Sequence, residues 1–148
     1  MSRGLLFFNL IFMPIFLWAQ DFDRSNHGDV LINEVMANPV GLTMLPETEY
    51  VEIYNISNND LSLNGWVFVY DGKETALPDV VLLSGGYAVL YRSGRDIMVA
   101  EGALSLGIDK FPSALANTSK TIGLKNSKGE MIDEITYPNA TAGKSYER

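Results

Sequence analysis

The sequence predicts an all-β domain of the β-sandwich type, and three observations support this. Short runs rich in β-branched and aromatic residues alternate with turn-forming residues from residue 29 to the end of the 148-residue chain. Within these runs apolar and polar residues alternate, as in strands that bury one face. No internal repeat and no low-complexity tract interrupts the pattern. About seven short strands with frequent turns are typical of a sandwich.

The first two strands are expected over residues 29–37 and 49–56. In the second strand, Val51 and Ile53 share one parity and are expected to face the core, while Glu52 faces water. The cluster Ser-Asn-Asn-Asp that follows is a turn signal.

A third strand is expected over residues 65–71, and its apolar residues on both faces predict a central strand covered on both sides. Asp71-Gly72 is the strongest hairpin signal in the chain and leads into a strand over residues 73–77. The remaining strands are expected over residues 80–83, 87–91, 121–125 and 131–137.

The segment 92–117 is less regular, because three glycines and one proline interrupt it. A weak helical period around residues 97–106 is compatible with a short helical turn, and a long irregular loop fits the sequence equally well. In a sandwich this segment would connect the two sheets across one end. Since long loops are uncommon without a role, it is the first place to expect function.

The first nineteen residues have the layout of a secretory signal peptide. Arg3 supplies a basic start, the stretch from Gly4 to Trp18 is almost wholly apolar, and Ala19 offers a small residue for cleavage. A transmembrane anchor is the alternative, but a run of about fifteen apolar residues is short for a bilayer. We therefore expect a signal peptide over 1–19, cleavage near Ala19, a flexible lead-in over 20–28 and the folded domain over 29–148. The protein would be secreted, or held in the periplasm or cell envelope.

The charge and the cysteine count exclude several classes. Asp and Glu outnumber Lys and Arg by 18 to 11, and no basic cluster is present, so direct nucleic-acid binding is disfavoured. The chain has no Cys, which excludes a disulfide framework and a lipid anchor on cysteine. The domain must be stable through its core alone.

No pattern for catalysis emerges. The one histidine, His27, lies in the lead-in and is expected to be an exposed linker residue. No Gly-x-Ser-x-Gly elbow, phosphate-binding Gly-Lys-Ser/Thr or paired metal-binding His occurs. The sequence predicts no enzyme, no catalytic residue, no cofactor and no metal.

Carboxylates are the remaining candidates for chemistry. Glu49 and Glu52 differ in parity and would point to opposite faces of their strand. We expect a solvated sheet face with one buried, hydrogen-bonded Glu, and a weak calcium site is the alternative. The other acidic candidates are Asp21, Asp23, Asp29, Glu34 and Glu47.

The aromatic residues and the glycosylation sequons allow two readings each. Trp66 is expected in the core, and Tyr54 and Tyr91 are expected to be the most exposed tyrosines. A carbohydrate-stacking surface is the alternative to ordinary cross-strand packing. Sequons occur at Asn55, Asn117 and Asn139; they would matter in a eukaryotic secretory protein and are chance in a bacterial one.

Seven segments of the chain form a recognisable series: Ile32–Pro39, Glu49–Asn55, Asp60–Trp66, Ser84–Leu90, Leu115–Leu124, Lys128–Tyr137 and the closing Gly143–Arg148. In their order and spacing they resemble the lamin tail domain family. The resemblance covers nearly all of the expected domain and implies an immunoglobulin-like β-sandwich. Nothing in the chain resembles the coiled-coil rod of lamins. The signal style resembles that of exported bacterial proteins.

The resemblance implies a non-catalytic interaction module. Such a module would hold a protein or surface-polymer partner through its loops or a sheet edge. The alternative is an accessory domain, or fragment, of a larger exported hydrolase such as a nuclease or phosphoesterase. The sequence does not identify the partner.

Overall fold

The computed structural model describes residues 25–148 and is all-β in this range. The strands are β1 (Val30–Met36), β2 (Tyr50–Asn55), β3 (Leu61–Ser62), β4 (Val67–Tyr70), β5 (Lys73–Ala76), β6 (Val81–Leu82), β7 (Tyr87–Arg92), β8 (Leu104–Ile108), β9 (Lys120–Lys125), β10 (Met131–Tyr137) and β11 (Tyr146–Glu147). No helix among these residues is long and apolar enough to cross a membrane.

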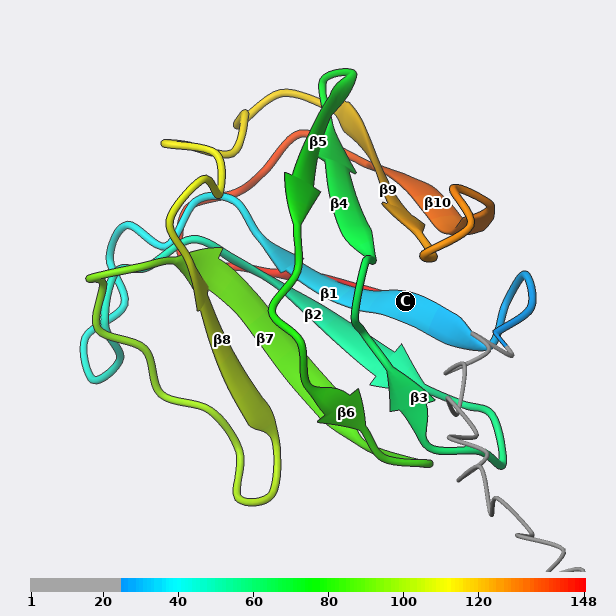
Figure 1. Ribbon diagram of the computed structural model, residues 1–148. Coiled ribbons are helices and arrows are strands. Elements are labelled where there is room, and N and C mark those ends of the chain that lie inside the picture. Colours follow the sequence, from blue (N-terminus) through cyan, green and yellow to red (C-terminus); the bar gives the residue numbers. More distant parts are fainter. Residues whose placement is uncertain (1–24) are drawn as a thin grey trace, which may run out of the picture.

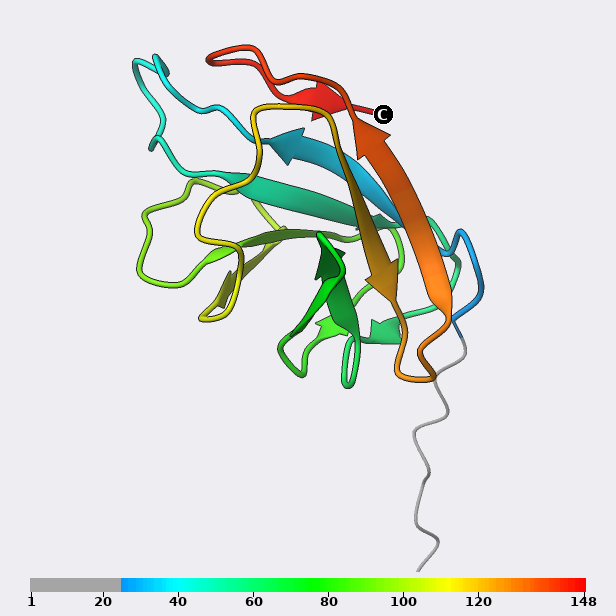
Figure 2. The same cartoon turned by 90° about the horizontal axis from the view of Figure 1, so that it is seen from above.

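Two sheets pack face to face, as a sandwich requires. One sheet has five strands in the order β11-β1-β2-β7-β8, and the other has four in the order β10-β9-β4-β5 (Figure 1). Seen from above, β9 and β10 cross over β1 and β2 (Figure 2). All paired neighbours are antiparallel except β7 and β8, which are parallel. The architecture confirms the predicted all-β immunoglobulin-like sandwich.

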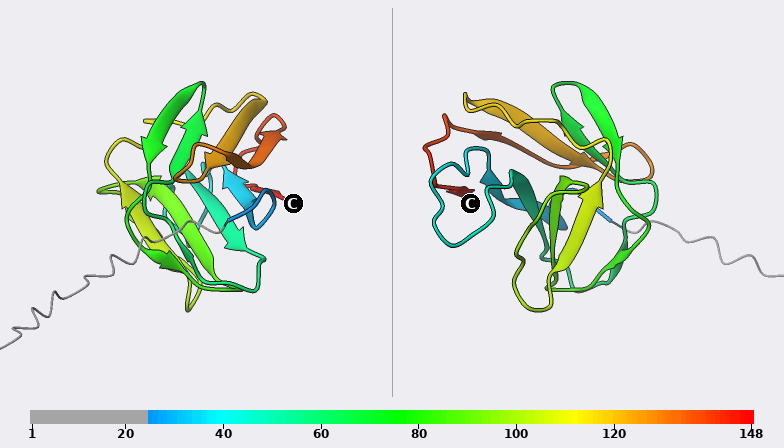
Figure 3. Two further views of the ribbon diagram at one scale, coloured as in Figure 1. Left: turned by 45° about the vertical axis from the view of Figure 1, so that its right-hand side comes forward. Right: turned by 90° about the vertical axis from the view of Figure 1, so that its left-hand side faces the viewer.

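The core lies between the two layers, which Figure 3 shows from two further sides. Trp66 and Phe68 are completely buried, and Val51 and Ile53 face them from the five-stranded sheet as predicted. Burying a large apolar side chain contributes roughly 1.5–3 kcal/mol. Since the chain has no cysteine, burial of these apolar side chains takes the place of disulfide bonds in stabilising the domain.

The prediction that residues 65–71 form a strand covered on both faces is wrong in one respect. Phe68 lies in the core, but Val67 and Val69, on the outer face, are only half-buried. The four-stranded sheet has no third layer above it, so its outer face meets solvent. The apolar residues there pack sideways against neighbouring strands.

The Asp71-Gly72 hairpin is confirmed. Both residues have positive φ, at 52° and 72°, and β4 pairs directly with β5. Asp and Gly are the residues that adopt this conformation at least cost. The predicted strand over 131–137 is present with the predicted bounds, and those over 80–83, 87–91 and 121–125 are present with ends shifted by one residue.

The helical alternative for residues 97–106 is wrong. That segment contains extended chain and then β8, which adds to β7 as a parallel neighbour. The chain then crosses to the other sheet between residues 109 and 119, as expected for a connection across one end. β11, which pairs with β1, was not predicted either.

A buried carboxylate joins the two sheets along one side. Asp133 of β10 accepts a hydrogen bond from the Ile32 amide of β1 at 2.8 Å and pairs with Arg148 at 2.6 Å. The Arg148 amide in turn donates to the Asn33 carbonyl. The closing Glu-Arg of the chain therefore ties β11 and β1 to the opposite sheet.

A two-stranded ribbon of β3 and β6 covers one end of the sandwich. The Asn55 side chain is completely buried and donates to the carbonyls of Asn59, Leu82 and Leu83. The Asn55 sequon is therefore inaccessible in the folded protein.

Residues 25–28, at the end of the expected lead-in, pack against the sandwich. Ser25 is buried, and the Gly28 amide donates to the Ile132 carbonyl at 2.8 Å. The packed domain therefore includes these four residues. The expected signal peptide over 1–19 lies outside the described residues.

Candidate functional site at the loop end

One end of the sandwich, here called the loop end, is built by three connections. They are the β1–β2 connection (37–49), the β7–β8 connection (93–103) and the crossover segment (109–119). The crossover segment belongs to the irregular region in which function was expected.

Two apolar side chains anchor the crossover segment in the core. Phe111 is 2% exposed and stacks on Phe68 with ring centroids 5.4 Å apart. Leu115 is also buried. Aromatic stacking of this kind adds about 0.5–1.5 kcal/mol to the area buried. The middle of the segment is therefore anchored in the core at these two residues.

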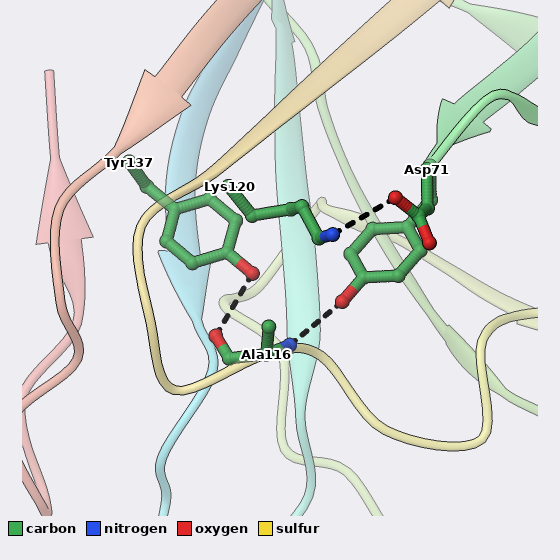
Figure 4. Close-up of polar contacts among 5 residues, drawn as sticks. Asp71, Ala116, Lys120 and Tyr137 are labelled. Atoms are coloured by element: carbon green, nitrogen blue, oxygen red, sulfur yellow. Dashed lines mark hydrogen bonds and ion pairs between the residues drawn. The ribbon is translucent and has the colours of Figure 1, made fainter.

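Side chains from three strands or their ends hold the crossover backbone. Glu49 accepts a hydrogen bond from the Leu115 amide at 2.5 Å, and the Tyr70 hydroxyl accepts one from the Ala116 amide at 2.7 Å. Tyr137 donates its hydroxyl hydrogen to the Ala116 carbonyl at 3.0 Å (Figure 4). The amide and the carbonyl of Ala116 are thus each hydrogen-bonded to a tyrosine, one from β4 and one from β10. Burial is the main cause that raises the pKa of Tyr137, so its hydroxyl keeps its proton well into alkaline solution.

An exposed ion pair stands beside this cluster. Lys120 donates to Asp71 at 2.9 Å, and its ammonium lies 5.8 Å from the centre of the Tyr70 ring (Figure 4). The hydrogen bond with Lys120 lowers the pKa of Asp71, and the same bond raises the pKa of Lys120. Since the pair is exposed, its contribution to stability is small.

Two further contacts complete the frame. Thr75 donates its hydroxyl hydrogen to the Lys110 carbonyl at 3.2 Å, and Arg92 donates to the Phe111 carbonyl at 3.1 Å. The crossover segment thus has a fixed shape, set by strands that are distant from it in sequence.

A cleft of about 230 Å³ opens beside the crossover segment. It is lined by Ala37, Asn38, Pro39, Val40, Glu47, Thr48, Glu49, Arg92, Arg95, Phe111, Pro112, Ser113 and Asn117. Three segments that carry the lamin tail resemblance, those around Asn38, Glu49 and Asn117, meet in it. Part of the cleft lining therefore comes from segments that carry the family resemblance.

Charges of both signs line the cleft. Glu47 accepts a hydrogen bond from the Gly41 amide at 2.9 Å and so fixes the turn at the start of the β1–β2 connection. Burial raises the pKa of Glu49, while the Leu115 amide and the charge of Arg95 act in the opposite direction. A cleft lined by charges of both signs suits a polar segment of a partner.

The loop tips around the cleft expose large apolar side chains. Met44 is 89% exposed and Met98 is 66% exposed. The two connections that carry them are joined by a hydrogen bond from the Thr48 hydroxyl to the Asp96 carbonyl at 2.5 Å. Val40 and Leu45 are exposed as well. Flexible methionines on a surface are a common feature of protein-binding sites.

The structure separates the carboxylates that the sequence placed together. Glu49 points to the crossover segment, whereas Glu52 lies on the outer face of the five-stranded sheet and accepts from the Asn33 side chain at 2.8 Å. The opposite-face expectation is confirmed. In the described part of the chain no group of three or more His, Cys, Asp or Glu is arranged to hold a metal ion. Asp21 and Asp23 lie outside the described residues.

His27 and the tyrosines can now be placed. His27 is exposed in the turn before β1. Tyr54 and Tyr91 are half-buried, and Tyr87 is the exposed tyrosine at 38%, so the expected order of exposure is wrong. Tyr87 stacks on Tyr54 across neighbouring strands, which shields Tyr54.

The sequence did not reveal the cleft. Its lining comes from segments up to eighty positions apart, which only the sheet topology brings together. The single available signal was the irregular segment 92–117, which supplies one wall.

Comparison with known families agrees with this architecture. The sequence model described as Lamin Tail Domain matches residues 23–139, which is more than half of the chain. The closing Gly143–Arg148 segment lies beyond the matched range. A search of curated proteins finds no match. The chain therefore belongs to the Lamin Tail Domain family, whose immunoglobulin-like β-sandwich is a non-enzymatic, interaction-type domain.

Proposed function

We propose that this protein is an exported, non-catalytic interaction module that binds a partner protein through its loop end. The observation that carries the proposal is the combination of a fixed crossover segment, a charged cleft beside it and exposed methionines around it. A surface held rigid before binding loses less entropy when the partner docks.

The loop end is a better binding surface than a sheet edge. Of the four edge strands of the two larger sheets, β11 and β5 have two and four residues, which is short for pairing with an added strand. The other two, β8 and β10, have five and seven residues, and β10 is already joined to β1 through Asp133. The loop end instead offers side-chain chemistry of several kinds. Protein interfaces combine apolar contacts with hydrogen bonds and charged groups, and the loop end offers all three.

Export is supported by the layout of residues 1–19. N-terminal sequencing of the protein recovered from a bacterial host tests it, and a mature chain that begins at or near Gln20 is expected. A protein that retains residues 1–19 and sediments with membranes would favour the anchor instead.

The function is tested by capture from cell-envelope extracts. Residues 20–148 are immobilised, and retained proteins are compared for the wild type and for a variant that combines Met44→Ser with Met98→Ser. We expect a retained protein that the variant loses, because the exposed apolar anchors are removed from the loop end. The matched control combines Val81→Ser with Leu83→Ser at the opposite end, where exposure is 52% and 59%.

Three outcomes would count against the proposal. Equal capture by both variants would place the partner elsewhere on the molecule, and capture of a polysaccharide alone would assign a polymer-binding role. Capture that only a calcium chelator abolishes would favour a calcium site. If the open reading frame continues past Arg148 into a hydrolase, the accessory-domain alternative holds and the loop end would contact that domain.

A further inference from the structure

The outer face of the five-stranded sheet carries side chains in three rows that run across the strands. The pairing places Met36, Tyr50 and Tyr91 in one row and Leu31, Tyr54 and Tyr87 in another. Between them, Glu147, Glu34, Glu52 and Val89 form the central row. Glu52 thus lies between Tyr50 and Tyr54 on its own strand, and Glu34 and Glu147 continue the acidic row onto β1 and β11. We call this the tyrosine–carboxylate face.

The central row is electrostatically unfavourable as it stands. Glu34 is directly opposite Glu147 on one side and Glu52 on the other, and like charges in such positions destabilise a sheet. None of the ion pairs among the described residues involves these three side chains. Burial together with the charges of Glu34 and Glu147 raises the pKa of Glu52. A cation placed over this row would relieve the repulsion.

The tyrosine rings on both sides are held in place. Tyr54 and Tyr87 stack with their centroids 4.3 Å apart and their planes 16° apart, and Tyr87 remains 38% exposed. On the other side, Tyr50 donates to Glu34 at 2.7 Å, and the Tyr91 hydroxyl lies 3.1 Å from that of Ser105. The aromatic groups are therefore preorganised.

An apolar layer supports these rings. Met36 and Val89 are buried at 5% and 4% exposure, although they lie on the outer side of the sheet and outside the main core cluster. Aromatic and aliphatic groups around the carboxylates exclude water, which strengthens attraction to a cation. The faces of tyrosine rings attract cations in addition.

The geometry points to a docking site for a basic peptide segment, in which Lys or Arg side chains lie over the Glu147–Glu34–Glu52 row and against the tyrosines. Charge complementarity selects this occupant: the face is acidic, and the whole chain has a net charge of −7, so basic segments are attracted from a distance. The site is separate from the loop end, and its occupation does not depend on the function proposed for that end.

Binding of a labelled decapeptide of alternating Lys and Ala tests the assignment. The protein, expressed from the full 148-residue sequence, is titrated at physiological salt, and fluorescence anisotropy gives the Kd. We expect binding that weakens about three- to tenfold in Glu147→Gln and in Glu52→Gln, and similarly in Tyr87→Leu. A decapeptide of Glu and Ala is expected not to bind.

Glu134→Gln is the matched control, because Glu134 is an exposed acidic residue on the opposite sheet and the change in net charge is the same. Its Kd is expected to match that of the wild type. A thermal unfolding scan separates binding from folding, since Glu52→Gln is expected to bind less tightly while the free protein becomes more stable. Equal weakening by Glu134→Gln, or no binding of the basic peptide by the wild type, would overturn the assignment.

Discussion

At the residue scale, the position of Glu52 depends both on its own strand and on the strand paired with it. Its strand parity directs it away from the core, where the Asn33 amide group binds one of its oxygens. Register then places Glu34 directly opposite it. The first fact follows from the sequence, but the second depends on pairing between strands. A residue expected to be merely solvated therefore lies in a crowded acidic row.

Glu52→Gln is predicted to stabilise the protein at neutral pH. The pKa of Glu52 is raised in the folded state, so the folded protein holds that proton more tightly than the unfolded chain does. The resulting stability is present at pH values below the ordinary 4.5 and is lost as the pH rises through the folded pKa. Gln keeps the contact with Asn33 and removes the charge, so a gain of about 0.5 kcal/mol is expected at pH 7 and almost none at pH 4.

Urea unfolding at the two pH values measures this difference, with Glu134→Gln as the control. A gain of the same size at pH 4 would show that the ionisation of Glu52 is not its cause.

At the element scale, the crossover segment is the part of the fold that most needs its neighbours. It has no ladder of its own, and its amides are bound by Glu49 and Tyr70 instead. Such side-chain contacts satisfy backbone groups that would otherwise be buried without partners. A connection with the composition of a loop thus becomes a fixed wall of the cleft.

Tyr70→Phe is predicted to destabilise the protein by about 1 kcal/mol, because the half-buried Ala116 amide loses its acceptor. Urea unfolding measures the change. Tyr91→Phe is the matched control, since its hydroxyl contacts Ser105 at an exposed position, and a change below about 0.5 kcal/mol is expected there. Equal effects of the two substitutions would contradict the role given to Tyr70.

The elements differ in how well the sequence predicts them. Alternation and a strong turn signal revealed β2, β10 and the hairpin between β4 and β5, because these depend on local patterns. β8 was missed because its five residues include Gly107 and its partner is a parallel neighbour, a pairing that no local pattern indicates. β11 is two residues long and exists only as an addition to β1.

The candidate sites were less predictable than the strands. The cleft needs three connections to converge, and the tyrosine–carboxylate face needs the register of β1, β2, β7 and β11. The sequence shows the residues that form the cleft and the tyrosine–carboxylate face. It does not show which of them lie side by side, since a shift of one residue in register would send every side chain of a strand to the other face.

At the scale of the whole molecule, an ion pair between Arg148 and Asp133 joins the two sheets. Arg148, 42% exposed at its side chain, pairs with Asp133, which is 5% exposed and also binds the Ile32 amide. The two sheets are thereby linked through one buried carboxylate. Removing Arg148 leaves the buried Asp133 carboxylate without its cation, and removing Asp133 leaves the Ile32 amide without its acceptor.

Arg148→Ala is predicted to lower the free energy of unfolding by about 2 kcal/mol, because the buried Asp133 carboxylate loses its cation. Chemical denaturation gives the value. Lys128→Ala, at an exposed turn position, is the control and is expected to have little effect. A loss no greater than that of the control would show that the pair does not link the sheets.

Amide hydrogen exchange tests whether the crossover segment, which forms one wall of the cleft, is held in place before any partner binds. We expect the Leu115 and Ala116 amides to exchange within about tenfold of the β9 amides, because each donates to a fixed side chain. Residues 96–100, which lie outside any strand, are expected to exchange much faster. Exchange of Leu115 and Ala116 as fast as that of residues 96–100 would show that the crossover segment is not held in place in the free protein.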